Sequence, residues 1–594
     1  MRTKIIIAIF FIAWFTLLVR LYYISVESNK YYDRLSNKNT IKIEAIAPIR
    51  GEIIDIKGNP IAINQLGFKI AVKPHIRDKK QLSNTLESIV KLLPTLEYEK
   101  LLKLYRQRNS SYYHNPIILV DFISYETIMP IYTQLNLIEE IKITAAPKRF
   151  YPNKSVAAHI VGYVSKANSK EMSSNPYARL IGTIGKSGIE KFYNGYLQGS
   201  AGERTIKVSA FNEEISELSL QQPKENQDIQ LNIDMDLQKY IAKLFKGKSG
   251  SAIVMDTEGR LLAAGSYPEY DLNTFVGGIS KKEWKTLIND PNVPFTNKII
   301  HGLYPPGSTI KTGLGLSYIT SELNEWESFN CTGSMELGGR NFRCWKRWGH
   351  GNTSLIKAIR ESCDDYFYKG SLKVGIKRIS DDLKRYGLGK KTGIDLPREF
   401  IGTVPSRAWK RKKYNRPWYI GETLNSSIGQ GDFLVTPIQI TQFTALMATG
   451  KLLVPYIVKE VGGIKNSAPA YDVLTALEKK KLPLIQRAMY EVCNHQKGTA
   501  ANYIDSKVTF AGKTGTAQVV GISQETKKRL KEEDMEYFRR SHAWFTTYGP
   551  YKNPQYIVTV LVEHGGHGGT AGGAIVSKIY NRLLETGYIK DISK

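Results

Sequence analysis

The longest apolar run of the chain lies at its N-terminus, and it constrains what every later segment can fold into. From Ile5 to Val26 the only charged residue is Arg20, which lies near the far end of the run and can reach the interface. About 20 predominantly apolar residues suffice for a helix to cross a bilayer, and only a helix or a closed barrel satisfies its backbone there. Residues 5–26 are therefore predicted to be a transmembrane anchor.

The short segment before this run indicates its orientation. Residues 1–4 contain Arg2 and Lys4, and positive charge favours the cytoplasmic side, so these residues are expected to form a cytoplasmic tail. A cleaved signal peptide is the alternative, but no Ala-x-Ala-like site follows the run. In either case the rest of the chain is expected to be exported.

Composition allows several folded domains and raises one alternative function. The chain has 594 residues, 42% of them hydrophobic, and a formal net charge of +28. Such a charge could indicate nucleic-acid binding. The cations are scattered, however, and the densest clusters, residues 410–413 and 527–529, are expected in loops or insertions without a nucleic-acid motif. A solvated surface, or attraction to anionic lipid and polymer, is favoured instead.

A proline–glycine turn runs directly into a Ser-x-x-Lys tetrad that ends at Lys311. Pro306 and Gly307 break any preceding element, and the apolar residues beyond them recur at four-residue spacing, so a buried helix is expected to begin near Ser308. Positions i and i+3 share a helix face, which places Lys311 beside Ser308. A serine becomes a nucleophile when a neighbour takes its proton, and an amine in an apolar, cation-crowded site can do so.

Two further motifs lie downstream in order, Ser362-Cys363-Asp364 and Lys513-Thr514-Gly515-Thr516. Ser362 is expected to relay a proton between Lys311 and a leaving group, and Asp364 to orient the site or pair with a lysine. Serine and aspartate also cap helices, so a structural role remains open for each.

The last of these motifs follows a β-prone run, residues 508–512, which is expected to be a strand. The tetrad should then line an edge, with Lys513 and Gly515 on one face and Thr514 and Thr516 on the other. Lys513 would supply positive charge for a substrate carboxylate and Thr516 a hydroxyl donor. Gly515 would let a substrate backbone approach closely.

These motifs, in this order, resemble those of the class B penicillin-binding proteins, most closely the elongation-type group called penicillin-binding protein 2. The resemblance covers nearly the whole chain. It implies an α/β protein in which the transmembrane helix precedes a mixed α+β pedestal, of the dimerisation type, at residues 40–230. A penicilloyl-serine transferase (serine β-lactamase-like) domain then follows at residues 231–590, with an antiparallel sheet flanked by helices.

Within the expected pedestal, Arg50 and Glu190 are candidates for a structural ion pair, and Gly58-Asn59 for a hairpin turn. His159 is expected to be a packing histidine rather than a ligand. No catalysis is assigned here.

In the second domain, residues 251–256 and 259–263 are expected to form a hairpin, and residues 541–545 and 555–562 two more strands. A helix is expected at residues 574–584. Gly429 and Gly431 are predicted to set a tight loop behind the site.

The resemblance implies a serine-type peptidoglycan D,D-transpeptidase that is a penicillin target, with weak carboxypeptidase activity as a further expectation. Ser308 would attack the D-Ala-D-Ala carbonyl of a stem peptide, with Lys311, Ser362, Asp364 and Lys513 as the other catalytic residues. Thr514, Gly515 and Thr516 would bind substrate, and the backbone N–H groups of Ser308 and Thr516 would form the oxyanion hole. No organic cofactor is expected.

The resemblance also implies partners and a location. The expected partners are nascent peptidoglycan peptides, β-lactams, a membrane glycosyltransferase and other proteins of the rod-shape complex, but no nucleic acid. The protein would be a single-pass protein of the inner membrane with a periplasmic catalytic domain.

Three alternatives remain. A division-type transpeptidase is disfavoured by Asp364, because division-type relatives usually have Asn at this position. A β-lactamase or penicillin sensor would need a base that activates water, and the spacing from Glu422 to Asn425 is one residue short of the class A pattern. A pseudoenzyme scaffold is disfavoured because all three motifs are intact.

The cysteines suggest a metal site beside the second motif. The chain has four cysteines, and three of them lie near one histidine, as Cys331, Cys344, His350 and Cys363. In an exported chain a Cys331–Cys344 disulfide is the ordinary expectation. Three cysteines and one histidine also form a standard closed zinc site. Zinc is favoured, in a structural role that holds Ser362 and Asp364 in place.

Overall fold

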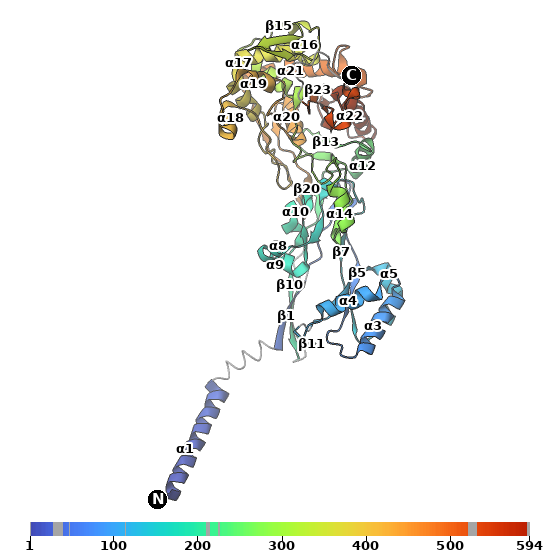
Figure 1. Ribbon diagram of the computed structural model, residues 1–594, viewed down its shortest axis with the longest axis vertical. Coiled ribbons are helices and arrows are strands. Elements are labelled where there is room, and N and C mark those ends of the chain that lie inside the picture. Colours follow the sequence, from blue (N-terminus) through green and yellow to red (C-terminus); the bar gives the residue numbers. More distant parts are fainter. Residues whose placement is uncertain are drawn as a thin grey trace.

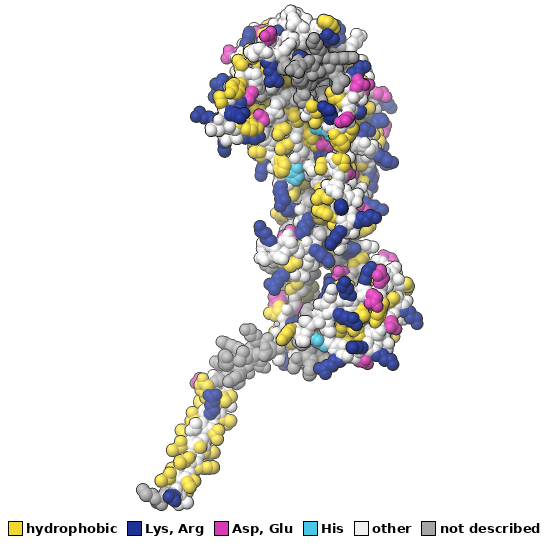
Figure 2. Space-filling model, in the orientation of Figure 1, with side chains coloured by type: hydrophobic (Ala, Val, Ile, Leu, Met, Phe, Trp, Pro, Cys, Tyr) yellow, Lys and Arg dark blue, Asp and Glu magenta, His cyan; other side chains and the backbone are white. Residues whose placement is uncertain are grey.

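The computed structural model describes residues 2–27, 40–46, 48–112, 115–209, 214–223, 226–520 and 531–590. Helix α1 (Arg2–Tyr22) continues into one π-helical segment (Tyr23–Glu27), and together they are long and apolar enough to cross a membrane. Its side chains are all exposed and almost wholly hydrophobic (Figure 2). The helix includes the predicted span and begins three residues before it.

The rest of the molecule is elongated, with a pedestal near the anchor and a larger domain at the far end (Figure 1). Two small sheets form the base of the pedestal. The first consists of β1 (Ile41–Ile46), β10 (Gly202–Val208) and β11 (Glu214–Gln221). The second consists of β5 (Ile117–Ser124), β4 (Gly67–Val72) and β6 (Ile141–Ala145), and helices α3 (Lys79–Leu92), α4 (Tyr98–Arg108), α5 (Tyr125–Ile128) and α6 (Tyr132–Asn136) accompany it.

The upper pedestal consists of short elements joined by turns, and it contains two of the predicted features. Its elements are α7 (Ala158–Val161), β8 (Val164–Lys166), α8 (Ser169–Ser174), α9 (Pro176–Ile181), β9 (Thr183–Gly185), α10 (Gly188–Phe192) and α11 (Asn194–Gln198). The Arg50–Glu190 ion pair is confirmed at 2.6 Å. His159 is buried, and its Nε2 lies 2.6 Å from the Pro294 carbonyl oxygen, so its packing role is confirmed.

One six-stranded sheet joins the two halves of the chain. Its order is β21 (Ile464–Lys465), β20 (Val458–Val461), β12 (Ile229–Leu231), β2 (Ile53–Ile54), β3 (Pro60–Gln65) and β7 (Lys148–Phe150). Strand β12 pairs in parallel with β2 and antiparallel with β20. The expected boundary near residue 230 therefore falls inside a strand shared by both halves. The predicted hairpin at Gly58-Asn59 is confirmed as the β2–β3 turn.

The far domain is built on a five-stranded antiparallel sheet. Its order is β14 (Leu261–Tyr267), β13 (Gly250–Asp256), β25 (Tyr556–Val562), β24 (His542–Gly549) and β23 (Ala511–Ala517). Successive strand residues face opposite sides, so Thr546 bonds Thr444 of α20 (Pro437–Thr449) while Thr547 bonds Tyr580 of α22 (Gly568–Glu585). Helices therefore cover both faces, as the resemblance implied.

The remaining elements of this domain precede and surround the motifs. They are α12 (Met235–Leu244), α13 (Asn273–Val276), α14 (Lys281–Ile288), α15 (Lys311–Ile319), β15 (Ser328–Cys331), β16 (Ser334–Leu337), β17 (Arg340–Arg343), β18 (Gly351–Ser354), α16 (Leu355–Arg360), α17 (Asp364–Arg385), α18 (Arg407–Tyr414), α19 (Ile420–Ser427), β19 (Leu452–Leu453), β22 (Ala470–Tyr471) and α21 (Ala476–Asn494). Helix α15 is wholly buried, which explains its apolar sequence.

Several predicted boundaries were wrong. Strand β23 begins at Ala511, three residues later than the predicted start at residue 508, and it includes the Lys-Thr-Gly-Thr tetrad, which was expected to be extended. Helix α22 begins six residues earlier than residue 574, because its glycine-rich first turns fit against β23 and β24. The basic residues 410–413 lie in helix α18 rather than in a loop. The cluster at 527–529 lies outside the described residues.

Candidate active site

Ser308 lies in a tight turn at the head of the buried helix α15. The turn, Gly307–Ile310, is a 3₁₀ helix, and α15 continues from it at Lys311. Residues three apart share one side of a 3₁₀ turn, so the placing of Lys311 beside Ser308 stays a prediction although the first turn is not α-helical. The hydrogen bonds of the Lys311 amine go to Ser362 and Asp364. Ser308 is partly exposed, whereas Lys311 is completely buried.

The Lys311 amine is surrounded by acceptors from the second motif. Its Nζ lies 2.7 Å from Asp364 Oδ1, 3.0 Å from the Ser362 carbonyl oxygen and 3.5 Å from Ser362 Oγ. The predicted pairing of Asp364 with a lysine is thus confirmed. Ser362 itself has a φ of 55°, an uncommon value for a residue with a side chain. This backbone conformation turns both of its oxygens toward Lys311.

Lys513 approaches Ser362 from the opposite side. Its buried Nζ donates to Ser362 Oγ at 3.0 Å and to the Thr514 carbonyl at 2.9 Å. Burial and the nearby Lys311 ammonium lower the pKa of Lys513 well below its usual range. The Ser362 hydroxyl therefore lies between two lysines, one of which is disposed to be neutral.

Strand β23 is the edge strand of the sheet, as predicted. The tetrad residues on its two faces contact different parts of the protein. At Gly515 the close approach is to the protein itself, because a Cβ there would lie 2.8 Å from Thr309 Cγ2. Thr514 is buried, and its Oγ1 lies 2.7 Å from Thr499 Oγ1. Thr516 is partly exposed. Gly515 thus lets the strand pack against the turn that contains Thr309, a reason that the sequence pattern did not provide.

The predicted glycine loop, around Gly429 and Gly431, lies behind the turn Gly307–Ile310 that carries Ser308, here called the nucleophile turn because Ser308 is its candidate nucleophile. The Gly307 N–H donates to the Gly429 carbonyl at 3.0 Å, and Gln430 Nε2 donates to the Thr516 carbonyl at 3.2 Å. Gly429 has a φ of +69°, and a Cβ on it would lie 2.2 Å from the Gly307 carbonyl oxygen. Only glycine fits here. The loop ties the nucleophile turn to β23.

A second anchor of this turn was missed by sequence reasoning. Trp544 of β24 donates its indole N–H to the Pro305 carbonyl at 3.0 Å. Tyr304 donates to Glu563 at 2.7 Å, and Glu563 lies 3.7 Å from the buried Lys298 amine. These residues come from distant segments and have no common motif, so nothing in the sequence pointed to them.

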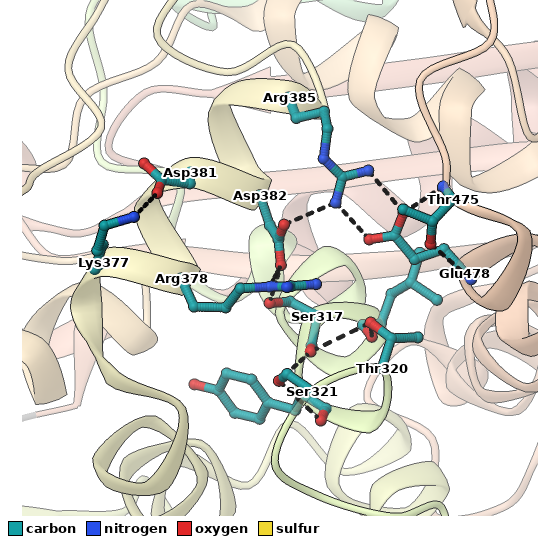
Figure 3. A network of polar contacts seen from close by, with 12 residues as sticks. Ser317, Thr320, Ser321, Lys377, Arg378, Asp381, Asp382, Arg385, Thr475 and Glu478 are labelled. Atoms are coloured by element: carbon teal, nitrogen blue, oxygen red, sulfur yellow. Dashed lines mark hydrogen bonds and ion pairs between the residues drawn. The ribbon is translucent and has the colours of Figure 1, made fainter.

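A buried ionic network fixes the far ends of the helices that carry the motifs (Figure 3). Asp382 of α17 accepts from Ser317 of α15 at 2.6 Å and from Arg385 at 2.7 Å. Arg385 donates to Glu478 of α21 at 2.7 Å. Although burial opposes it, hydrogen bonds from Arg385 and Tyr386 lower the pKa of Glu478 to about 2. The network joins α15, α17 and α21 into one unit.

The four predicted metal ligands gather in one place. The donor atoms of Cys331, Cys344, His350 and Cys363 all lie within 4.8 Å of one another, and all four residues are buried. All four cysteines of the chain are among the described residues, and none forms a disulfide. A tetrahedral zinc site with bonds of about 2.0–2.3 Å needs ligand separations of this order, so the donor set fits zinc.

This cysteine–histidine cluster adjoins the second motif. The Asp364 N–H donates to Cys344 Sγ at 3.4 Å, and the Trp345 N–H donates to Asp364 Oδ2 at 3.0 Å. Asp364 thus accepts from Lys311 with one carboxylate oxygen and from the loop after Cys344 with the other. The position of the cluster therefore determines the position of the carboxylate.

The Glu422 side chain, considered above as a base for hydrolysis, has a structural role. It pairs with Lys410 at 2.5 Å, and it accepts from the Tyr419 N–H at 2.7 Å at the start of α19.

Comparisons with known proteins identify both halves of the chain. The family model for the penicillin binding protein transpeptidase domain matches residues 250–585, and that for the penicillin-binding protein dimerisation domain matches residues 45–231. The peptidoglycan D,D-transpeptidase MrdA of Escherichia coli K12 is 32% identical, over 96% of this chain and 91% of the relative. MrdA of Haemophilus influenzae is also 32% identical, over 96% and 89%.

Solved structures agree with this result. The structure of Helicobacter pylori penicillin-binding protein 2 in complex with MreC has a TM-score of 0.85 and 44% identity, covering 93% of this chain and all of the other. Pseudomonas aeruginosa penicillin-binding protein 2 has a TM-score of 0.69 and 29% identity, covering 91% of this chain and 97% of the other.

Proposed function

Since the chain belongs to the penicillin-binding protein transpeptidases, in the penicillin-binding protein 2 (MrdA) group, and is a serine peptidoglycan D,D-transpeptidase, we propose that Ser308 is its nucleophile. The observation that carries this proposal is the arrangement around Ser362 Oγ, which lies 3.5 Å from Lys311 Nζ and 3.0 Å from Lys513 Nζ. The buried amines of Lys311 and Lys513, with the Ser362 hydroxyl between them, form a proton-transfer chain. Its first member, Lys311, lies three residues after Ser308 in the sequence.

Acylation follows from this chain. Two lysines compete for one carboxylate, so one of them is disposed to lose its proton. Exchange through Ser362 Oγ lets the neutral state reach Lys311, which takes the Ser308 proton as the hydroxyl attacks the D-Ala-D-Ala carbonyl carbon. The backbone N–H groups of Ser308 and Thr516 stabilise the oxyanion. Ser362 then donates a proton to the nitrogen of the departing D-Ala as the peptide C–N bond breaks, and it recovers a proton from the protonated Lys311.

Deacylation reverses the proton path. The amine of a second stem peptide, which we propose to be that of diaminopimelate, attacks the acyl-enzyme and loses its proton to the same chain. The new amide forms as the ester bond to Ser308 breaks, and Lys311 passes a proton back to Ser308 Oγ, which regenerates the enzyme. The partly exposed Thr516 would donate its hydroxyl to the substrate carboxylate.

We also propose a structural zinc ion held by Cys331, Cys344, His350 and Cys363. All four positions of a tetrahedron would be filled by protein, so the ion would supply no open site for water and would act by fixing Asp364.

The pedestal at residues 40–230 would hold the catalytic domain, residues 231–590, away from an inner membrane that residues 5–26 span once, with the N-terminus in the cytoplasm. By analogy with the Helicobacter pylori complex, MreC or a similar rod-shape protein would be a partner. A membrane glycosyltransferase would supply the glycan strands.

Intact-mass analysis after treatment with benzylpenicillin tests the proposal. One stable adduct is expected, mapped by peptide sequencing to Ser308 and absent in Ser308→Ala. The variant should melt at the temperature of the wild type. An adduct that maps to another residue would refute the assignment, and rapid turnover of the drug would favour hydrolysis instead.

A further inference from the structure

Helix α18 presents a cluster of cations whose role the mechanism leaves unexplained. Its exposed members are five, and here they are called the α18 cations: Arg407, Arg411, Lys412, Lys413 and Arg416. The sequence contains no acidic residue between Glu399 and Glu422. Lysine and arginine side chains gather over this helix at the edge of the catalytic domain (Figure 2).

None of the α18 cations forms an ion pair within the described part of the chain. The helix has one paired cation, Lys410, which is buried against Glu422 of α19. Lys413 lies over the rings of Trp409 and Tyr414, at 4.9 Å from each centroid. The charge on the outer face is therefore unbalanced and available to an external anion.

Helix stability alone does not explain this charge. Cations stabilise the C-terminal turn of a helix, where Arg411, Lys412 and Lys413 lie. Arg407, however, is the first residue of α18, where the helix dipole disfavours positive charge, and Arg416 lies beyond the helix end. The charge of Arg407 and Arg416 therefore has another cause than helix stability.

The helix is connected to the active site through two contacts. Lys410 pairs with Glu422 of α19 at 2.5 Å, and the Tyr414 hydroxyl donates to Asp432, just after the glycine loop, at 2.9 Å. Helix α18 is thus attached to both ends of the segment that contains α19 and the glycine loop. That loop accepts the Gly307 N–H through Gly429. The α18 cations thus flank the segment that supports the nucleophile turn.

An anionic membrane is not a suitable partner for this surface. The pedestal strand β1, the first described after the anchor, lies at the opposite end of the elongated molecule from α18 (Figure 1). Electrostatic attraction to lipid headgroups falls off within about 10 Å at physiological salt. The partner must therefore be an anion that reaches the catalytic domain.

We propose that the α18 cations bind the free carboxylates of a peptidoglycan strand, and so hold the polymer beside the active site. The inference rests on the proposed function, which makes carboxylate-bearing stem peptides the substrate. Several weak, long-range contacts to a flexible polyanion would raise its local concentration and its association rate without fixing one geometry.

The test measures binding of soluble, uncross-linked peptidoglycan strands to the full chain in detergent at low salt. The variant R407Q/R411Q/K412Q/R416Q removes four charges and keeps Lys413 on its aromatic rings. Its dissociation constant is expected to rise about tenfold, since each exposed charge contact contributes a factor of about two. The dependence of binding on salt should weaken as well. Strands whose carboxylates are amidated should bind both proteins equally.

Two matched variants separate charge from other effects. K239Q/K243Q/K246Q/K248Q neutralises four exposed lysines on and after α12 and should bind like the wild type. R407K/R411K/R416K keeps the α18 charge and should also bind normally. The proposal is overturned if the α18 variant binds strands like the wild type, or if K239Q/K243Q/K246Q/K248Q loses as much affinity for strands. It is also overturned if the α18 variant loses binding to anionic phosphatidylglycerol vesicles but not to strands.

Penicillin acylation of the same proteins keeps the two proposals apart. The α18 variant should acylate at Ser308 at the wild-type rate, because β-lactams do not need the polymer contact. Loss of strand binding with normal acylation supports the α18 site. Absence of a Ser308 adduct in the wild type would refute the proposed nucleophile, whatever the strand-binding result.

Discussion

The pedestal and the catalytic domain each bury two cations beside one carboxylate, but they use different cations. In the pedestal Glu190 accepts from Arg50 Nε and Arg149 Nε, each at 2.7 Å. Burial opposes ionisation of Glu190, yet the two guanidinium groups lower its pKa below the usual range. In the catalytic domain Lys311 and Lys513 lie near the single carboxylate of Asp364.

The two clusters differ in how they accommodate the second cation, which the single carboxylate cannot neutralise. Guanidinium groups keep their protons, and their fixed donors reach backbone carbonyls as well, as Arg149 does at Gly51. An amine can instead release its proton, and burial together with Lys311 lowers the pKa of Lys513. The same balance of charges thus gives a permanent structural cluster with arginine and a proton-transfer site with lysine.

Lys513→Arg should break this distinction with the largest effect. A guanidinium cannot become neutral, so acylation by penicillin is expected to slow by about 10²–10⁴-fold, the usual contribution of a general base. The second-order acylation rate, measured by stopped flow, checks this, with circular dichroism as the control for folding. An acylation rate within a factor of three of the wild type would show that Lys513 need not lose its proton.

Arg149→Met should break the pedestal cluster instead. Removing one partner of a buried ion pair costs about 3–5 kcal/mol of unfolding free energy. Urea unfolding should reveal this loss, while the folded variant at low temperature still acylates at the wild-type rate. Lys186→Met, which breaks the partly exposed pair with Glu171, is the matched control and should cost much less. Equal losses in the two variants would contradict the comparison.

Loss of the proposed zinc ion should have a smaller effect on catalysis. Cys363→Ser removes one ligand, so the protein is expected to lose its stoichiometric zinc and to acylate about tenfold more slowly, because Asp364 is no longer held. Elemental analysis and thiol titration measure metal content. Cys493→Ala, outside the cluster, should keep one zinc per chain. Wild-type protein without zinc, or with a Cys331–Cys344 disulfide, would refute the site.

Glu269 provides a contrast to Glu190 and Asp364, because it is a carboxyl group with no ion pair among the described residues. It accepts from the Ala157 N–H at 2.8 Å, and burial raises its pKa to about 8. A raised carboxyl pKa stabilises the fold at acid pH, and this contribution is lost as pH rises from about 4.5 through 8. Glu269→Gln should therefore raise the melting temperature by a few degrees at pH 8 and leave it unchanged at pH 4.5.

Thermal melts of the two proteins at both pH values measure this effect. A stabilisation that is equal at both pH values would mean that ionisation of Glu269 is not its cause.

The sequence by itself determined the parts that depend on local order. The apolar run 5–26 requires a helix whatever surrounds it, because lipid leaves the backbone no other partner. The hairpin strands β13 and β14 followed from the local sequence pattern, and the pairing of Asp364 with a lysine from residue type. The Arg50–Glu190 pair was expected from the resemblance to the penicillin-binding proteins rather than from local order. The three cysteines and the histidine of the predicted zinc site were also chosen from the sequence, and in the structure their donor atoms converge. The zinc ion itself stays a prediction.

Only the tertiary structure decided which groups share a proton or a charge. The contacts of Ser362 with two lysines depend on its φ of 55° and on strand β23, which lies some 150 residues downstream. Arg149 joins Glu190, and Asp382 joins Glu478 through Arg385, across long stretches of chain that have no common pattern. Interactions between distant segments depend on packing geometry, and a linear spacing rule reaches only as far as one helix turn or one strand pair.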